Sequence, residues 1–118
     1  GFAAPAWLYS PGAAAAVRAA GFRYLTTHLR LRDLARGADD WSFGISNRPG
    51  PAAGDRLGRL VNRTLVTAHA PAPLVRLAIH PADLDFGRPF DHTLRLLDGL
   101  LAAGREPLTY LEWLERRP

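Results

Sequence analysis

The 118-residue chain contains no cysteine, no methionine and no lysine. Without cysteine it has no disulfides, no thiolate metal site and no cysteine nucleophile. All fifteen basic residues are therefore arginine, and with eleven acidic residues they give a formal charge of +4. The arginines are scattered and form no aromatic-basic platform, so we expect no nucleic-acid partner.

Long hydrophobic runs are also missing. No stretch approaches the ~18 apolar residues of a transmembrane helix, and no charged-then-apolar leader resembles a signal peptide. We therefore expect a soluble chain with no membrane partner, and we favour the cytoplasm over other compartments. The chain opens at Gly1 on a strand-like segment with no initiator methionine, which suggests a fragment. We expect residues 1–118 to form a single partial domain.

The pattern of apolar residues predicts strands that alternate with helices. Ser10 followed by Pro11 indicates a helix start, and the spacing of Thr109 and Glu112 indicates a capping box. Strands are expected at 2–7, 22–27, 29–34, 74–79 and 107–109, with a short one at 41–45 inside a loop at 37–54. Helices are expected at 11–20, 57–68, 89–103 and 110–116.

This alternation is typical of an α/β fold in which crossover helices join parallel strands. Four or five short strands make a poor closed barrel and leave at least one sheet edge bare. The edge therefore calls for a missing N-terminal half or for a second copy of the chain.

One histidine occupies a position suited to catalysis. The segment 75–79 has strand character, and His80 follows it directly, with Pro81 preventing further pairing. Open α/β folds place reactive groups at the carboxyl ends of such strands. His80 is thus the candidate proton carrier, since an imidazole exchanges a proton near neutral pH.

Several short motifs together resemble the polysaccharide deacetylase family. Leu77-Ala78-Ile79-His80 matches its late L-x-I-H motif, and the segment 2–8 is similar to its mid-chain proline motif. The helix after Ser10, the following Gly-Phe-Arg-Tyr segment and the terminal 107–114 segment also resemble a deacetylase-like subgroup. The resemblance spans nearly the whole chain and implies the C-terminal part of a deformed (β/α) barrel.

The resemblance also implies roles for individual residues. His80 would be the general acid that protonates the leaving amine during removal of an acyl group. Leu77 would line the pocket for the acyl methyl group. Pro5 and Trp7 would contribute to the carbohydrate groove, and Trp41 would shape it as part of an aspartate-and-tryptophan motif at 39–41.

Each of these residues also has a structural interpretation. His80 could satisfy a strand-end carbonyl, and Leu77 and Trp7 could be core fillers. The 39–41 segment could be a solvated acidic turn beside a packed aromatic ring. Asp83 could orient the imidazole of His80 or cap the turn that follows it.

Two departures from the family pattern limit what this chain can do. The family's arginine two residues before the motif proline is Ala3 here, so the usual support for the catalytic base is absent. The family's aspartate pair and His-x-x-x-His motif, which hold a divalent metal such as zinc, have no counterpart in the sequence. A group formed by His80, Asp83, Asp85 and His92 is the remaining alternative for a metal.

We therefore expect a carbohydrate deacetylase-like hydrolase fragment that supplies the general acid and part of the groove, is inactive alone, and has its metal ligands outside this chain. The alternative is a non-catalytic α/β interaction module, or a truncated remnant, that pairs through its open sheet edge.

Overall fold

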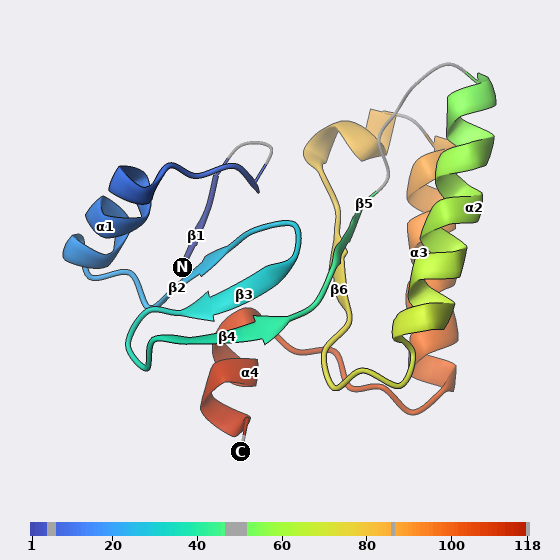
Figure 1. Ribbon diagram of the computed structural model, residues 1–118. Coiled ribbons are helices and arrows are strands. Elements are labelled where there is room, and N and C mark those ends of the chain that lie inside the picture. Colours follow the sequence, from blue (N-terminus) through green and yellow to red (C-terminus); the bar gives the residue numbers. More distant parts are fainter. Residues whose placement is uncertain (5–6, 47–51, 86, 118) are drawn as a thin grey trace. The chain divides into compact units, whose positions relative to one another are not determined.

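The computed structural model describes residues 1–4, 7–46, 52–85 and 87–117, and shows a mixed α/β chain (Figure 1). The chain forms two compact units, which we describe separately. Unit 1 comprises Gly1–Ser42 and Pro107–Pro118, and unit 2 comprises Phe43–Glu106. Within the described ranges, no helix is both long and apolar enough to cross a membrane.

Unit 1 is built on a four-stranded mixed sheet. The strands lie in the order β1-β2-β3-β4, with β1 and β2 parallel and the remaining pairs antiparallel. Their bounds are Phe2–Ala3 for β1, Tyr24–Thr26 for β2, Arg30–Asp33 for β3 and Ala38–Trp41 for β4.

Helix α1 (Pro11–Ala19) packs on one face of this sheet. Ser10 caps it by accepting a hydrogen bond from the Ala13 N–H, as the sequence predicts. Val17 of α1 joins Leu25 and Leu34 in the buried core of unit 1. One apolar side of a short helix therefore covers the part of the sheet near Leu25.

The opposite face of the sheet contacts helix α4 (Tyr110–Arg116). Its capping box is present, because Thr109 accepts from the Glu112 N–H while the Glu112 side chain accepts from the Thr109 N–H. Tyr110 stacks edge-on against Tyr24 of β2, with ring centroids 5.5 Å apart. Leu114 is fully buried.

Unit 2 contains a two-stranded parallel sheet and three helices. β5 (Gly44–Ser46) pairs with β6 (Arg76–Ala78) in parallel, which requires a crossover, and helix α2 (Ala52–His69) provides it. After β6 come a 3-10 helix, η2 (Pro81–Asp85), and helix α3 (Gly87–Ala102). Gly104 ends this last helix with φ at +81°, the left-handed backbone that glycine adopts without strain.

The interior of unit 2 is largely polar in the described residues. Ile45 is its one fully buried large apolar side chain, whereas five polar or charged residues are also buried. These are Asn62, Arg76, Asp83, His92 and Thr93.

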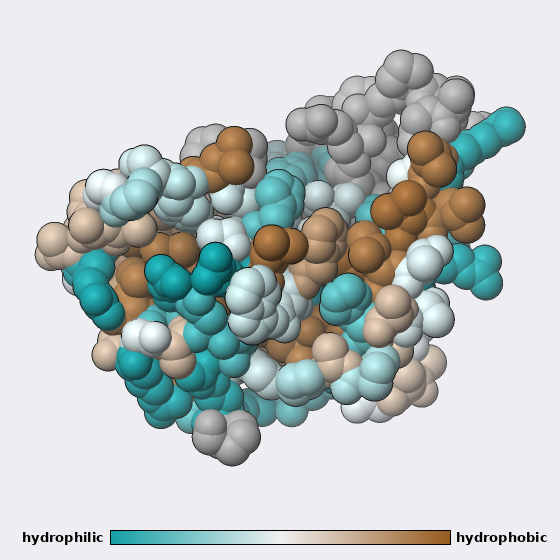
Figure 2. Space-filling view, viewed as in Figure 1, coloured by the Kyte–Doolittle hydropathy of each residue, from teal (hydrophilic) through white to brown (hydrophobic). Residues whose placement is uncertain are grey.

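Apolar residues instead lie on the outside of unit 2. Leu57, Leu60 and Val61 of α2 are 62%, 62% and 46% exposed. Figure 2 shows hydrophobic residues gathered over this helix, at the right of the view. The buried side of α2 carries Asn62, whose amide donates to the Ser46 carbonyl oxygen at 3.0 Å. We call residues 57, 60 and 61 the α2 apolar face.

The structure confirms most predicted elements and corrects four expectations. The predicted strand at 107–109 is wrong, since these residues are irregular and serve to begin α4. The predicted short strand at 41–45 is replaced by β4 and β5, which leave residues 42 and 43 between them. The single parallel sheet is wrong, because β2, β3 and β4 form antiparallel hairpins and β5 pairs only with β6.

The fourth correction concerns β6, which the sequence predicts as a buried apolar strand. Its most buried side chain is Arg76, at 2% exposure, while Leu77 and Ala78 are half-buried and Ile79 is 49% exposed. The described residues form no closed barrel.

Candidate functional site

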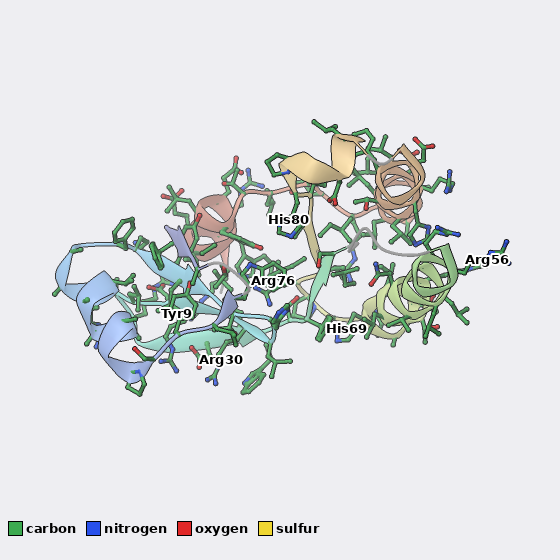
Figure 3. All side chains as sticks on the ribbon, turned by 90° about the horizontal axis from the view of Figure 1, so that it is seen from above. Tyr9, Arg30, Arg56, His69, Arg76 and His80 are labelled. Atoms are coloured by element: carbon green, nitrogen blue, oxygen red, sulfur yellow. The ribbon has the colours of Figure 1, made fainter. Side chains whose placement is uncertain are left out.

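His80 lies just beyond the carboxyl end of β6, at the junction with η2 (Figure 3). The strand ends at Ala78 because Pro81, which has no N–H, begins the 3-10 helix. His80 is exposed. Its backbone N–H, and not its ring, donates to Asp83.

Asp83 closes the turn that carries His80. Its Oδ2 atom accepts from the His80 N–H at 2.8 Å, and its own N–H donates to the His80 carbonyl oxygen at 2.8 Å. This pair of bonds confirms that Asp83 caps the turn. The side chain is 1% exposed, and its Oδ1 atom has no hydrogen-bond partner in the described part of the chain.

Leu77 lies on β6, three residues before His80. It is paired in register with Ile45 of β5, which is buried. Leu77 itself is half-buried, so part of its side chain stays accessible beside the strand end. Leu77 is the middle residue of β6, and His80 follows the last residue of that strand by two positions.

Trp7 and Pro5 belong to unit 1, and Pro5 lies outside the described residues. Trp7 has φ at +55°, a left-handed backbone that is strained for a residue with a side chain. Its backbone N–H donates to the Ala4 carbonyl oxygen at 2.9 Å. Its ring meets the ring of His28 edge-on, with ring centroids 4.4 Å apart. These contacts fix the indole in a half-exposed position.

Trp41 is the last residue of β4 and is 66% exposed. The guanidinium of Arg30 lies 4.9 Å from the centroid of its ring. Arg30 and Trp41 are directly opposite in the antiparallel β3–β4 pair, so both side chains project from the same sheet face. The indole therefore has one side covered by a cation, an arrangement that holds an exposed ring in place.

Asp39 lies beside this pair and binds two arginines. Arg30 NH1 donates to Oδ2 at 2.7 Å, and Arg32 donates through Nε to Oδ1 at 2.7 Å and through NH2 to Oδ2 at 3.0 Å. These hydrogen bonds, chiefly those from Arg32, lower the pKa of Asp39 to about 2. Asp39 therefore remains a carboxylate at neutral pH.

The expectation of a solvated acidic turn at 39–41 is wrong. All three residues lie in β4, and Asp40 projects from the opposite face to Asp39. Asp40 accepts from Trp113 Nε1 at 3.0 Å and from Arg117 NH1 at 2.6 Å, which joins β4 to α4 and the residue after it. Two adjacent aspartates thus have separate structural partners.

The structure leaves the proposed site residues in two groups. Trp7 and Trp41 lie in unit 1, whereas Leu77 and His80 lie in unit 2. Across the described residues, no three histidine, aspartate or glutamate side chains lie close enough together to hold a metal ion.

Sequence reasoning missed the contribution of Arg30 and Arg32. Their period-two spacing with Leu31 indicated a strand, but it did not show that both guanidiniums would meet Asp39 across the hairpin. The turn residues between the two strands could have suggested this pairing, because Gly37, with φ at +68°, permits the reversal.

No family model, no curated protein and no solved structure matches this chain.

Proposed function

We propose that this chain is the C-terminal part of a deformed-barrel carbohydrate deacetylase, similar to the polysaccharide deacetylase family, and that His80 is its general acid. The observation that carries the proposal is the position of His80, exposed beyond a parallel strand on a turn that Asp83 closes. Reactive groups of α/β enzymes occupy such strand ends. The ring is free of the bonds that hold the turn.

The reaction is hydrolysis of an N-acyl or O-acyl group on a carbohydrate. Water adds through its oxygen to the acyl carbon and gives one proton to a base outside this chain. The bond to the sugar nitrogen or oxygen then breaks, and His80 gives a proton to the departing atom. A half-buried leucine three residues before the acid, Leu77, offers an apolar surface for the acyl methyl group.

A divalent metal such as zinc would polarise the acyl carbonyl in such an enzyme. The described residues hold no fitting ligand group. The sequence also lacks the His-x-x-x-His motif. We therefore place the ligands outside this chain and assign it no step that involves the metal.

The experiment is acetate release from N-acetylglucosamine oligomers by the complete protein that includes this chain. We expect release that stops when a chelator removes the metal and returns when zinc is restored. The 118-residue chain alone, with zinc added, should release none. A complete reading frame that encodes neither an aspartate pair nor a His-x-x-x-His motif would contradict the enzymatic proposal.

A second candidate is a non-catalytic interaction module, and the α2 apolar face favours it. Large aliphatic side chains that remain exposed on one helix mark a surface that another protein surface covers. The outer edges of β5 and β6 are also unpaired in the described residues. Under this alternative, Leu60→Asp would abolish self-association in sedimentation, whereas His80→Gln would change neither association nor any activity.

A further inference from the structure

One face of the unit 1 sheet is only partly covered by α1. Leu25, Arg32 and Asp39 are opposite one another across β2, β3 and β4, so their side chains share this face. Arg30 and Trp41 form the next same-face pair along β3 and β4. Helix α1 covers Leu25, which leaves a charged and aromatic strip beside it.

A groove of about 530 Å³ lies between α1 and the Arg32 end of this strip, where Leu34 and Gly37 also line it. Ala15 and Ala19 border it from the helix, and their short side chains leave it open. Arg18 and Arg32 contribute guanidinium groups, and no carboxylate lines it in the part of the chain described. Its volume is within the range of small-molecule sites, about 300–1,000 Å³.

Both guanidiniums are held in place by their own hydrogen bonds. Arg18 donates from Nε and NH2 to the Leu34 carbonyl oxygen at 3.2 and 2.8 Å. Arg32 uses the same two nitrogens for Asp39. Among the described residues, the NH1 group of each of these arginines makes no hydrogen bond. Because their planes are already oriented, a bound anion orders little additional side chain.

The exposed ring of Trp41 lies at the edge of the strip. Trp41 is diagonal to Arg32 across the β3–β4 pair, a separation of about 7–8 Å in such a register. Arg30 covers one face of the indole. The apolar C–H face of a sugar ring can stack on an exposed indole while the acid group reaches a guanidinium.

We propose that this groove binds an acidic saccharide, with its carboxylate at Arg18 and Arg32 and the adjoining sugar ring on Trp41. The negative charge of the ligand follows from the excess of arginine: Arg32 and Arg30 share a single carboxylate, Asp39, and Arg18 has a carbonyl oxygen as its acceptor. The choice of a saccharide rests on the proposed function. Counting Arg30, three arginines and one aspartate give the groove and strip a net charge of +2.

The test is calorimetric titration of the 118-residue chain with tetragalacturonate, with neutral galactotetraose, with adenosine monophosphate and with inorganic phosphate. We expect tetragalacturonate to bind at least about tenfold more tightly than the other three. Equal affinity for the neutral oligomer would overturn the assigned charge. Tighter binding of the nucleotide, or of phosphate alone, would overturn the assigned class.

Two matched variants locate the site. Ala15→Leu should fill the groove and weaken tetragalacturonate binding by about tenfold or more, because Ala15 borders it. Ala16→Leu is the control, since Ala16 is exposed on the same helix and does not line the groove. Circular dichroism should show that both variants fold.

If Ala15→Leu and Ala16→Leu bind tetragalacturonate with equal affinity, the ligand does not bind in this groove. If the complete protein releases no acetate while the 118-residue chain binds tetragalacturonate, only the proposed function is contradicted. Acetate release that depends on His80, without any saccharide binding to the groove, would contradict this inference alone.

Discussion

The backbone N–H of His80 and the Oδ2 atom of Asp83 are 2.8 Å apart and form a hydrogen bond. Asp83 therefore fixes the main chain beneath the candidate acid and does not contact its ring through this bond. The buried carboxylate positions His80 by shaping the turn, which separates its role from proton transfer itself.

Asp83→Ala should destabilise unit 2 by about 1–3 kcal/mol, because it leaves the His80 N–H without its acceptor. Asp83→Asn keeps an acceptor oxygen and should cost less. Urea unfolding monitored by far-ultraviolet circular dichroism measures the stability of both variants, and amide hydrogen exchange measures the protection of the His80 N–H directly. Equal stability of the alanine variant and the unaltered chain would contradict the role of Asp83.

The pKa of Asp39, lowered to about 2 by Arg32 and Arg30, predicts a pH dependence. A carboxylate with a depressed folded pKa stabilises the fold above its unfolded pKa, and that stability is lost as the pH falls through the folded value. The loss should therefore occur between about pH 4 and pH 2. Carbon-13 NMR should show the Asp39 carboxyl titrating at about 2.

Asp39→Asn should remove part of this acid-dependent loss of stability. Some should remain, because the pKa of Asp33 is also lowered: burial raises it, but hydrogen bonds from the Arg36 N–H, Arg23 and the Ala35 N–H outweigh burial. Asp91→Asn, at an exposed position, is the control. An Asp39 carboxyl that titrates near pH 4 would show that its ion pairs are absent in solution.

Trp7, with φ at +55°, predicts an unusual order of two substitutions. Both Trp7→Ala and Trp7→Gly lose the ring contact with His28, but only glycine adopts the left-handed backbone without strain. Trp7→Gly should therefore be the more stable variant, by up to about 1 kcal/mol. Thermal unfolding decides this, and a more stable alanine variant would mean that the backbone relaxes.

Local sequence signals predicted the starts of α1 and α4 and the end of α3, but not the start of α2 at Ala52, which lies inside the loop predicted at 37–54. Ser10 and Thr109 act as caps because a side-chain oxygen reaches an N–H only three residues away. Gly104 ends α3 for an equally local reason, its freedom to adopt a positive φ. Such features depend on neighbouring residues alone, and a single sequence contains them.

Strand pairing could not be predicted in the same way. The ion pair of Arg32 and Asp39 depends on a hairpin that joins β3 to β4. The sequence predicts residues 37–54 as a loop, so β4 was not expected there. The burial of Arg76 in place of apolar neighbours depends on the packing of unit 2. The apolar spacing on α2 predicted a helix but not that Leu57 and Leu60 would face outward.

The sequence likewise predicts those parts of the candidate site that depend on neighbouring residues, and not those that depend on long-range packing. The strand that ends before His80 follows from the apolar run and Pro81, which are contiguous in sequence. The sequence allows two roles for Asp83, orienting the imidazole or capping the turn, and its hydrogen bond to the His80 N–H shows that it caps the turn. The groove is lined by Arg18 of α1 and Arg32 of β3, and no local sequence motif predicts that these two residues lie close together.

The measurement that tests the central claim most directly is kcat for acetate release by the complete protein carrying His80→Gln, compared with its melting temperature. If His80 is the general acid, kcat should fall by roughly 10²–10⁴ while the melting temperature and metal content stay unchanged. His69→Gln is the matched control, because His69 is half-buried at the end of α2, where its ring contacts the Leu65 carbonyl of its own helix. Near-normal turnover in the His80 variant would contradict the account.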